Sequence, residues 1–419
     1  MNDALLNNYN RAPVTIVKGE GCELIDDQGT RYLDVIAGIA TCSLGHAHPA
    51  IADAVAGQAQ TLVHASNLFH HEPSGELARQ LVVRSGLSRA FFCNSGTEAN
   101  EAAIKLARKL AFRRGETERA TILACEGSFH GRTLGALAAT ANAAYKEGFG
   151  PMPGSFAFTP FNDVVALEKN LTAGVAAFIV EPVQGESGVV PADPAFLAAA
   201  RRLCDERGAL LIFDEIQCGM GRLGSLFAFM HYGVKPDVVT MAKALANGLP
   251  IGAMLVSEEA ADGLRPGDHG STFGGSPIPA AAALAHLRVR DGVDLDAHVQ
   301  KQSRYFFAQL RAIAAENSDI IGEPRGAGLL IGVPVREPYA ASDIVAAMRE
   351  HFVLAGTAGG NTVRFGPPLI ITKAEIDRAI SAFAQSLTHF CDSSTTKTGT
   401  GQARRTSSAT HPRNARMTL

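Results

Sequence analysis

Short apolar runs alternate with amphipathic stretches along most of the chain. The apolar runs, which are typical of buried strands, span residues 89–93, 121–124, 178–181, 210–214 and 238–241. The stretches with helical spacing include residues 72–83, 94–105 and 194–207. Strands that alternate with helices form βαβ units, so the pattern predicts an α/β fold with a mostly parallel central sheet and helices on both faces.

The two ends of the chain show a different pattern. Residues 14–35 predict a β-meander, because three short strand signals are separated by turns rich in Asp and Gly, and a helix is expected at 50–62. Alternating helix and strand signals near the C-terminus lie at 277–315, 322–333, 342–352, 362–365 and 373–390. We expect these C-terminal elements to form a small α+β domain together with the meander.

The length of 419 residues suggests more than one core, since single hydrophobic cores stop growing near roughly 250 to 300 residues. We expect residues 1–60 and 286–391 to form the small domain and residues 61–285 the large domain. Residues 392–419 are rich in Ser, Thr and Arg and almost free of apolar side chains, which predicts a disordered tail. A plain solvated extension is favoured over a contact with a polyanion.

The composition excludes several classes of protein. Lys and Arg number 38 against 41 for Asp and Glu, and a net charge of −3 argues against nucleic-acid binding. No apolar stretch reaches the roughly 18 residues of a membrane span, and the N-terminus does not resemble a signal peptide. Seven scattered cysteines indicate no disulfide or zinc framework. We therefore expect a cytoplasmic protein, in which His46 and His48 are local hydrogen-bonding groups rather than metal ligands.

Two ionisable residues follow buried strand signals. Asp214 ends the run 210–214, and Lys243 follows the run 238–241 in a small, apolar setting. An apolar pocket favours the neutral lysine amine, which can form a Schiff base with an aldehyde cofactor. A carboxylate facing a pyridine nitrogen keeps that nitrogen protonated, so that the ring accepts electrons. The pair fits pyridoxal phosphate chemistry, although Lys243 taken alone also fits a surface lysine.

The segment Asn-Ser-Gly-Thr-Glu-Ala-Asn at 94–100 opens a predicted helix directly after a strand. Ser95 and Glu98 have the spacing of a capping box. Gly96 permits close approach, and the free amides of a helix N-terminus also attract phosphate. Both interpretations are open and compatible. Ser95, Glu181, Asp214 and Lys243 are all expected at the carboxyl ends of strands, where ligands bind in such folds.

Five segments together resemble the class III, ornithine-type branch of the pyridoxal-phosphate aminotransferases. They are Asn-Ser-Gly-Thr-Glu-Ala-Asn at 94–100, Ser-Phe-His-Gly-Arg-Thr at 128–133, Asp-Glu-Ile-Gln at 214–217, Met-Ala-Lys at 241–243 and Gly-Ser-Thr-Phe-Gly-Gly at 270–275. Their order and spacing match from about residue 10 to residue 390. The resemblance implies a fold-type I transferase whose cofactor is pyridoxal 5′-phosphate.

The resemblance also implies a role for each matching residue around the cofactor ring. Lys243 would be the Schiff-base lysine and would move the proton. Asp214 would pair with the pyridinium nitrogen, and Gln217 would reach the phenolic oxygen. Ile216 and Phe129 would lie against the two faces of the ring.

The phosphate site and the assembly follow from the same resemblance. Ser95, Gly96 and Thr97 would hold the phosphate at the helix N-terminus. Thr272 would complete this site from a neighbouring subunit, which implies a homodimer with its active site at the subunit interface.

Three residues match substrate-binding residues of the family. The resemblance identifies Arg132 and Arg364 as carboxylate-binding arginines, and the third residue is Glu186. Glu186 would pair with Arg364 while an ω-amine donor is bound and release it for 2-oxoglutarate or glutamate. Arg132 would hold the far carboxylate in both half-reactions. A structural salt bridge between Glu186 and Arg364 is the alternative interpretation.

The pattern around Ile39 resembles the acetylornithine branch, because ornithine δ-aminotransferases carry a tyrosine there. Ser271 is a candidate for contacting the acetylated end of the donor. We therefore expect transfer of the δ-amino group of N-acetyl-L-ornithine to 2-oxoglutarate, a step of arginine biosynthesis. The alternatives are an ornithine, 4-aminobutyrate or other ω-amine aminotransferase and, outside the enzymes, a degenerate regulatory protein of the same fold.

Overall fold

The computed structural model describes residues 4–395, and a seven-stranded sheet forms the centre of its larger part. The strand order is β4-β12-β11-β10-β7-β5-β6, and β12 runs antiparallel to both of its neighbours while the other strands run parallel. The bounds are β4 (Arg89–Cys93), β5 (Thr121–Cys125), β6 (Phe156–Thr159), β7 (Val175–Val180), β10 (Leu210–Asp214), β11 (Val238–Met241) and β12 (Gly252–Val256). The predicted fold class is confirmed.

Both faces of this sheet are buried, because successive side chains of a strand point to opposite faces. In β10, Leu211 and Phe213 belong to one apolar cluster, whereas Leu210 and Ile212 belong to a second cluster on the other face. Helices α3, α7 and α9 contribute to the first cluster and α4 to the second. These helices are α3 (Glu72–Ser85), α4 (Gly96–Arg113), α7 (Pro194–Arg207) and α9 (Pro277–Gly292).

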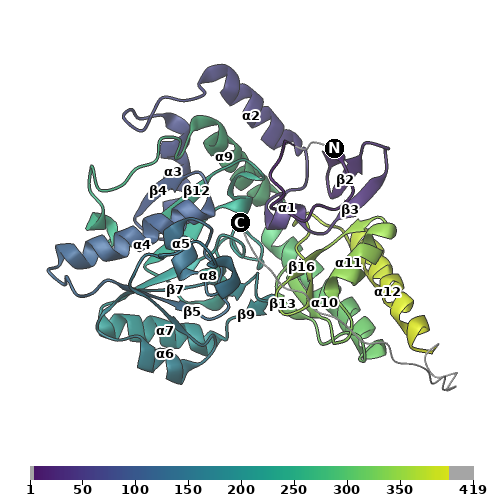
Figure 1. Ribbon diagram of the computed structural model, residues 1–419. Coiled ribbons are helices and arrows are strands. Elements are labelled where there is room, and N and C mark those ends of the chain that lie inside the picture. The colour runs from purple at the N-terminus through teal and green to yellow at the C-terminus, as the bar shows by residue number, and fades with distance from the viewer. Residues whose placement is uncertain (1–3, 396–419) are drawn as a thin grey trace, which may run out of the picture.

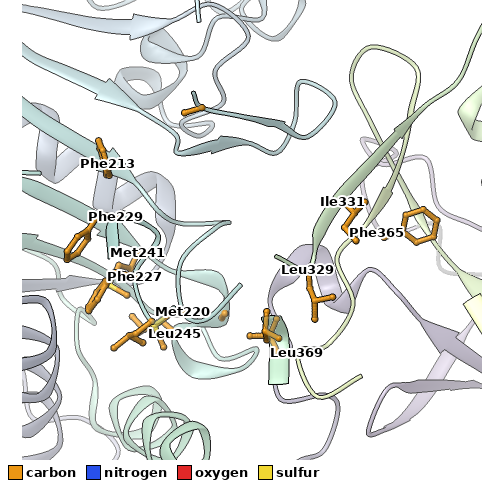
Figure 2. Close-up of a cluster of buried hydrophobic side chains, with 14 of the residues drawn as sticks. Phe213, Met220, Phe227, Phe229, Met241, Leu245, Leu329, Ile331, Phe365 and Leu369 are labelled. Atoms are coloured by element: carbon orange, nitrogen blue, oxygen red, sulfur yellow. The ribbon is translucent and has the colours of Figure 1, made fainter. Parts of the chain in front are cut away.

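The first cluster continues from the central sheet into the C-terminal part of the chain. Figure 2 shows Phe213 and Met241 of the central sheet on one side and Ile331 and Phe365 on the other, with Leu369 between the two groups. The large and small parts therefore share buried apolar contacts, which limit how far the edge of the sheet can shift relative to the C-terminal strands.

Strands from both ends of the chain meet in the smaller part. The meander consists of β1 (Ile16–Glu20), β2 (Glu23–Asp26) and β3 (Arg31–Asp34), and the C-terminal β15 (Val353–Leu354) pairs with β3 in parallel. A second sheet has the order β13-β14-β17-β16, with bounds Arg325–Ala327, Leu330–Pro334, Thr362–Phe365 and Gly356–Ala358. Figure 1 shows helices α10 (Leu295–Glu316), α11 (Ala341–Glu350) and α12 (Lys373–Thr395) gathered at this end of the molecule.

The remaining elements are short or connect the main ones. They are α1 (Ala37–Ala40), α2 (Pro49–Thr61), α5 (Leu134–Ala139), the 3-10 turn η1 (Ala143–Tyr145), α6 (Val164–Asn170), β8 (Val183–Gln184), β9 (Val190–Pro191), α8 (Ala228–Tyr232), η2 (Lys243–Ala246) and η3 (Ala261–Gly263).

The turn Ala37–Ala40 after β3 has an unusual backbone, with φ between 52° and 63° at each residue. This left-handed conformation costs a non-glycine residue roughly 1 to 2 kcal/mol, so tertiary contacts must hold it. The buried Asp34 supplies them: its Oδ1 accepts hydrogen bonds from the backbone N–H groups of Ile36 and Ala37, at 2.8 and 2.9 Å. Its Oδ2 lies 2.7 Å from Nε2 of His46.

Several predicted features can be compared directly. Strands β4, β10, β11 and β17 have the expected bounds, but β6 and β12 were missed. His46 and His48 are hydrogen-bonding groups, the first with Asp34 and the second with the N–H of Ala50 at the start of α2. The predicted tail begins at residue 392, whereas α12 continues to Thr395; residues 396–419 lie outside the described part.

Two further observations concern the chain as a whole. The six cysteines whose side chains the structure describes are all free. Among residues 4–395, no helix combines the length and apolar character that are needed to cross a membrane.

Candidate active site

A cavity of about 360 Å³ lies where the parallel strands of the central sheet end. Each strand delivers its wall residues from the loop that follows it, as the α/β topology predicts. Residues 94–97 follow β4, 129–132 follow β5, Glu181 follows β7, 214–217 follow β10, and Lys243 follows β11. Segments that are far apart in the sequence are therefore brought together by one edge of the sheet.

Lys243 is in the wall of this cavity, and its backbone has a strained, left-handed φ of 41°. Burial lowers the pKa of its ammonium group, while the nearby carboxylates of Glu186, Asp214 and Glu181 partly oppose that effect. A larger fraction of the Lys243 side chain is consequently neutral than in a surface lysine at the same pH. A neutral amine is what addition to an aldehyde requires.

Asp214 is buried, with 3% of its surface exposed, and is held from several sides. Its Oδ2 accepts a hydrogen bond from Nδ2 of Asn100 and lies 2.7 Å from Nδ1 of His130. Its Oδ1 accepts a bond from the backbone N–H of Ile216 at 3.1 Å. Asn100 is fixed in turn by Thr240, whose hydroxyl donates to Oδ1 of Asn100 at 2.7 Å. A buried carboxylate fixed in this way can face a cationic ring nitrogen without reorganising.

Helix α4 begins at the cavity with the expected N-cap. The hydroxyl of Ser95 donates to Oε2 of Glu98 at 2.7 Å and accepts a bond from the Glu98 N–H. A Cβ added to Gly96 would lie 2.7 Å from Cδ1 of Ile216, so no larger residue fits there without displacement. The first N–H groups of a helix lack intrahelical partners and attract anions, so this end can hold a phosphate.

Thr97 has a second set of contacts. Its Oγ1 lies 2.8 Å from Oγ1 of Thr133 and accepts backbone bonds from Arg132 and Thr133 at 3.2 Å. These bonds tie the loop after β5 to the start of α4. Phe129 and Arg132 are thereby placed over the same cavity as Gly96.

Glu186 and Arg364 form an ion pair at the cavity, with Oε1 and Nη1 2.5 Å apart. Nη1 of Arg364 also donates to the carbonyl of Gly185 at 3.0 Å, and Nε2 of Gln217 donates to Oε1 of Glu186 at 3.2 Å. Burial acts to raise the pKa of Glu186, but Arg364 outweighs it and holds that pKa below its usual range. Glu186 is thus an anion in this pair.

The residues in the cavity fit pyridoxal phosphate. A lysine, a fixed carboxylate and a helix N-terminus line one space, as the aldehyde, the ring nitrogen and the phosphate require. Oε1 of Gln217 is buried and has no hydrogen-bond partner among the described residues, so its amide has bonding capacity left for a ligand.

Four of the residues singled out in the sequence do not line this cavity, and one of them, Arg364, contacts it through its ion pair with Glu186. Thr272 and Ser271 lie in a turn whose carbonyls at Ser271 and Gly274 both accept bonds from Nδ2 of Asn67, and Thr272 is exposed. Ile39 is 48% exposed and borders a smaller space beside Arg364.

Two buried polar residues were not assigned a role from sequence. Glu181 accepts a hydrogen bond from the backbone N–H of Phe129, and burial, together with the nearby Asp214, raises the pKa of Glu181 well above its usual range. His130 touches Asp214 rather than facing solvent. Glu181 ends an apolar run as Asp214 does, so that signal was present; nothing local distinguished His130.

Comparison with known families gives a consistent result. The family model described as "Aminotransferase class-III" matches residues 5–387. Acetylornithine aminotransferase of Methanocaldococcus jannaschii is 46% identical over 383 residues, which cover 91% of this chain and 96% of that protein. Acetylornithine aminotransferase of Xylella fastidiosa is 48% identical over 373 residues, covering 88% and 91%.

Solved structures give the same fold. An ornithine aminotransferase from Toxoplasma gondii, with partial occupancy of PLP at its active site, has a TM-score of 0.89 at 35% identity and covers 93% of each chain. N-acetylornithine aminotransferase from Stenotrophomonas maltophilia has a TM-score of 0.80 at 37% identity, covering 92% of this chain and 98% of that one.

Proposed function

This chain belongs to the class-III aminotransferase family, and on that premise we propose that it transfers the δ-amino group of N-acetyl-L-ornithine to 2-oxoglutarate. The products are N-acetyl-L-glutamate 5-semialdehyde and L-glutamate, and the reaction belongs to arginine biosynthesis. The observation that carries the proposal is the Glu186–Arg364 ion pair beside Lys243, because it provides a site that can accept either an uncharged or an anionic group. Relatives 44–48% identical over most of the chain are named acetylornithine aminotransferases, which supports the choice of donor.

The cofactor is pyridoxal 5′-phosphate. When bound, it supplies an aldehyde that captures the substrate amine and a protonated ring that takes up the electron pair left on the substrate carbon. Lys243 would hold the aldehyde, Asp214 the ring nitrogen and Gln217 the phenolic oxygen. Ile216 and Phe129 would lie against the ring faces.

The phosphate is held at the start of α4 by Ser95, Gly96 and Thr97. Thr272 of a second subunit completes this site. In support, Thr272 is exposed in the single chain, and Phe273 beside it is 60% exposed. We infer a homodimer on this basis.

Lys243 moves the proton in both half-reactions. Burial lowers the pKa of Lys243, which favours the neutral amine that takes a proton from Cδ of the donor. In the second half-reaction it returns a proton to Cα of the glutamate that forms. Because one residue serves both directions, no second general base is required.

Charge recognition separates the two substrates. Arg132 holds the carboxylate far from the reacting carbon in both cases. With the donor bound, Glu186 keeps Arg364 neutralised; with 2-oxoglutarate, Glu186 moves away and Arg364 binds the second carboxylate in a two-point contact. Ser271 of the second subunit contacts the acetylated end of the donor across the interface.

The single decisive experiment compares kcat/KM for N-acetylornithine, ornithine and 4-aminobutyrate with 2-oxoglutarate as acceptor. We expect N-acetylornithine to be preferred by at least about tenfold. The reason is that Ile39 lacks the hydroxyl group of the tyrosine that ornithine δ-aminotransferases carry at this position. The structural similarity to ornithine aminotransferases makes ornithine the principal competitor. A preference for ornithine or 4-aminobutyrate would overturn the choice of donor while leaving the aminotransferase assignment intact.

The location of the protein is inferred from the same assignment. An aminotransferase that uses glutamate and 2-oxoglutarate, and whose described cysteines are all free, is expected in the cytoplasm. Cell fractionation with a tagged full-length chain would test this.

A further inference from the structure

The guanidinium of Arg132 lies over the ring of Tyr145, an aromatic side chain that the proposed function does not use. Its guanidinium carbon is 3.7 Å from the ring centroid of Tyr145 and 5.6 Å from that of Phe129. The two rings meet edge to face, with centroids 6.1 Å apart and planes at 89°. Arg132 therefore sits in a corner made by two aromatic rings.

The corner is anchored to the rest of the protein. Tyr145 ends the turn η1, in which Oδ1 of Asn142 accepts a bond from the backbone N–H of Ala144 at 3.0 Å. The next residue, Lys146, donates from Nζ to the carbonyl of Ala138 at 3.1 Å and lies 4.6 Å from the ring centroid of Phe158. These contacts hold the backbone on both sides of Tyr145.

The geometry of the stack matters for carboxylate binding. A guanidinium attracts an aromatic ring through its face and donates hydrogen bonds from its edge, so stacking leaves the edge free. No carboxylate among residues 4–388, whose side chains the structure describes, forms an ion pair with Arg132, in contrast to the Glu186–Arg364 pair. Arg132 is thus restrained without being neutralised.

We propose that Tyr145 is a positioning residue that holds Arg132 ready for the carboxylate far from the reacting carbon, and that it thereby sets the affinity for donor and acceptor together. The inference rests on the proposed function, in which Arg132 binds that carboxylate in both half-reactions. A long arginine side chain loses conformational freedom when it binds, and a stack present beforehand reduces that loss. Phe129 alone, at 5.6 Å, gives a weaker restraint.

The test measures the Kd of glutarate for the holoenzyme by calorimetry, since glutarate has both carboxylates of 2-oxoglutarate but cannot react. We expect Tyr145→Ala to raise this Kd about fivefold, as loss of a cation–π contact of ordinary strength would. Tyr145→Phe keeps the ring and should stay within about twofold of the wild-type Kd. Phe149→Ala removes a 62% exposed ring from the same segment and serves as the matched control, with an unchanged Kd.

A double-mutant cycle separates positioning from general support of the fold. In an Arg132→Ala background, Tyr145→Ala should cause no further loss of glutarate affinity, because its effect passes through Arg132. In turnover, Tyr145→Ala should raise the KM of both substrates with kcat nearly unchanged, the signature of equal loss from ground and transition states.

The possible outcomes separate a failure of the role of Tyr145 from a failure of the proposed function on which that role rests. Equal glutarate Kd values for wild type and Tyr145→Ala would overturn the role of Tyr145 and leave the proposed function standing. The same loss in both backgrounds would also overturn it, since Tyr145 would then act on the fold. A wild-type holoenzyme that does not bind glutarate would overturn the proposed acceptor, and the inference with it.

Discussion

Glu186 is held by two donors, Arg364 and Gln217, in a wall shared with Lys243. At this scale the chemistry depends on which charges are paired. Arg364 is paired and 8% exposed, whereas Arg132 is stacked and open to solvent. We interpret the difference as two distinct roles. Arg132 can bind a carboxylate in both half-reactions, whereas Arg364 can bind one only when Glu186 moves away.

Glu186→Ala should change the KM values of the two substrates in opposite directions. Without the competing carboxylate, Arg364 is free for substrate, so the KM for 2-oxoglutarate should fall by about tenfold, the equivalent of about 1.4 kcal/mol. The KM for N-acetylornithine should rise, because an unpaired cation then faces its uncharged end. Steady-state kinetics on both substrates would measure this.

The control for this change is Glu323→Ala, which breaks an exposed ion pair with Arg311 and should alter neither constant. A fall in kcat with no change in the ratio of the two KM values would contradict the switch and favour a structural salt bridge.

At the scale of elements, two local structures carry the site. The N-terminus of α4 is placed by β4 and closed by Ser95 and Glu98. The left-handed turn Ala37–Ala40 brings Thr41 to the cavity wall and is held by Asp34 and His46. The buried carboxylate of Asp34 stabilises the strained turn. The carboxylate of Glu98 takes part in the cap that closes the N-terminus of α4.

Gly96→Ala should weaken cofactor binding. The added Cβ would meet Ile216 at 2.7 Å, so either the ring-facing residue or the helix start must move. Overpacking of this kind costs about 1 to 3 kcal/mol, which corresponds to a loss of affinity of roughly five- to 150-fold. Titration of the apoenzyme with cofactor, followed by absorbance, gives the Kd. Gly57→Ala, in helix α2 with nothing within 4 Å of its added Cβ, is the control and should leave that Kd unchanged. An unaltered affinity in Gly96→Ala would contradict a close fit at this position.

His46→Gln should reduce stability in a pH-dependent way. The hydrogen bond to Asp34, followed by one to Cys42, raises the pKa of His46 to about 9, above the value near 6.5 expected in the unfolded chain. The stabilisation is therefore fully present below about pH 6.5 and is lost as the pH rises through about 9, a change on the order of 2 to 3 kcal/mol.

The measurement compares the Tm of wild type and His46→Gln at pH 6 and pH 9.5, at fixed protein and cofactor concentrations. The gap in Tm should narrow at the higher pH. A gap that is constant across this range would mean that His46 stabilises the turn without its charge.

At the scale of the whole molecule, the cavity lies where distant parts of the chain meet. The cavity wall takes Asp214 from the end of β10, Lys243 from the turn after β11 and Glu186 from the loop after β8. Arg364 of β17 lies outside this wall and pairs with Glu186. The proposed division into residues 1–60 with 286–391 and residues 61–285 would let the two parts shift slightly and thereby open the Glu186–Arg364 pair. The shared apolar cluster limits such a shift (Figure 2).

A mixed dimer would show whether Thr272 acts across subunits. Homodimers of Lys243→Ala and of Thr272→Asp should each be nearly inactive, the second because its added carboxylate repels the phosphate. In a mixed dimer, one site would carry both defects and the other neither, so random co-assembly should restore about a quarter of wild-type activity.

Purification of the co-expressed chains through two different tags isolates the mixed dimer, in which about half of wild-type activity is expected because one of its two sites is intact. Activity no higher than that of either homodimer would place Thr272 in the site of its own chain. The Thr272→Asp homodimer should still fold, since that residue is exposed.

The sequence by itself determined the fold class and the cofactor, and most of its candidate site residues line the cavity. Runs of apolar residues that end in polar residues mark β4, β10 and β11 with their full bounds. Ser95, Asp214 and Lys243 lie at or just after the ends of these strands. Only the tertiary structure decided the antiparallel β12, the contact of His130 with Asp214 and the contact of Arg132 with Tyr145, whereas the ion pair of Glu186 with Arg364 was expected from the sequence. The physical reason is that periodicity records which face of an element is buried, whereas these contacts depend on which elements a folded sheet brings side by side.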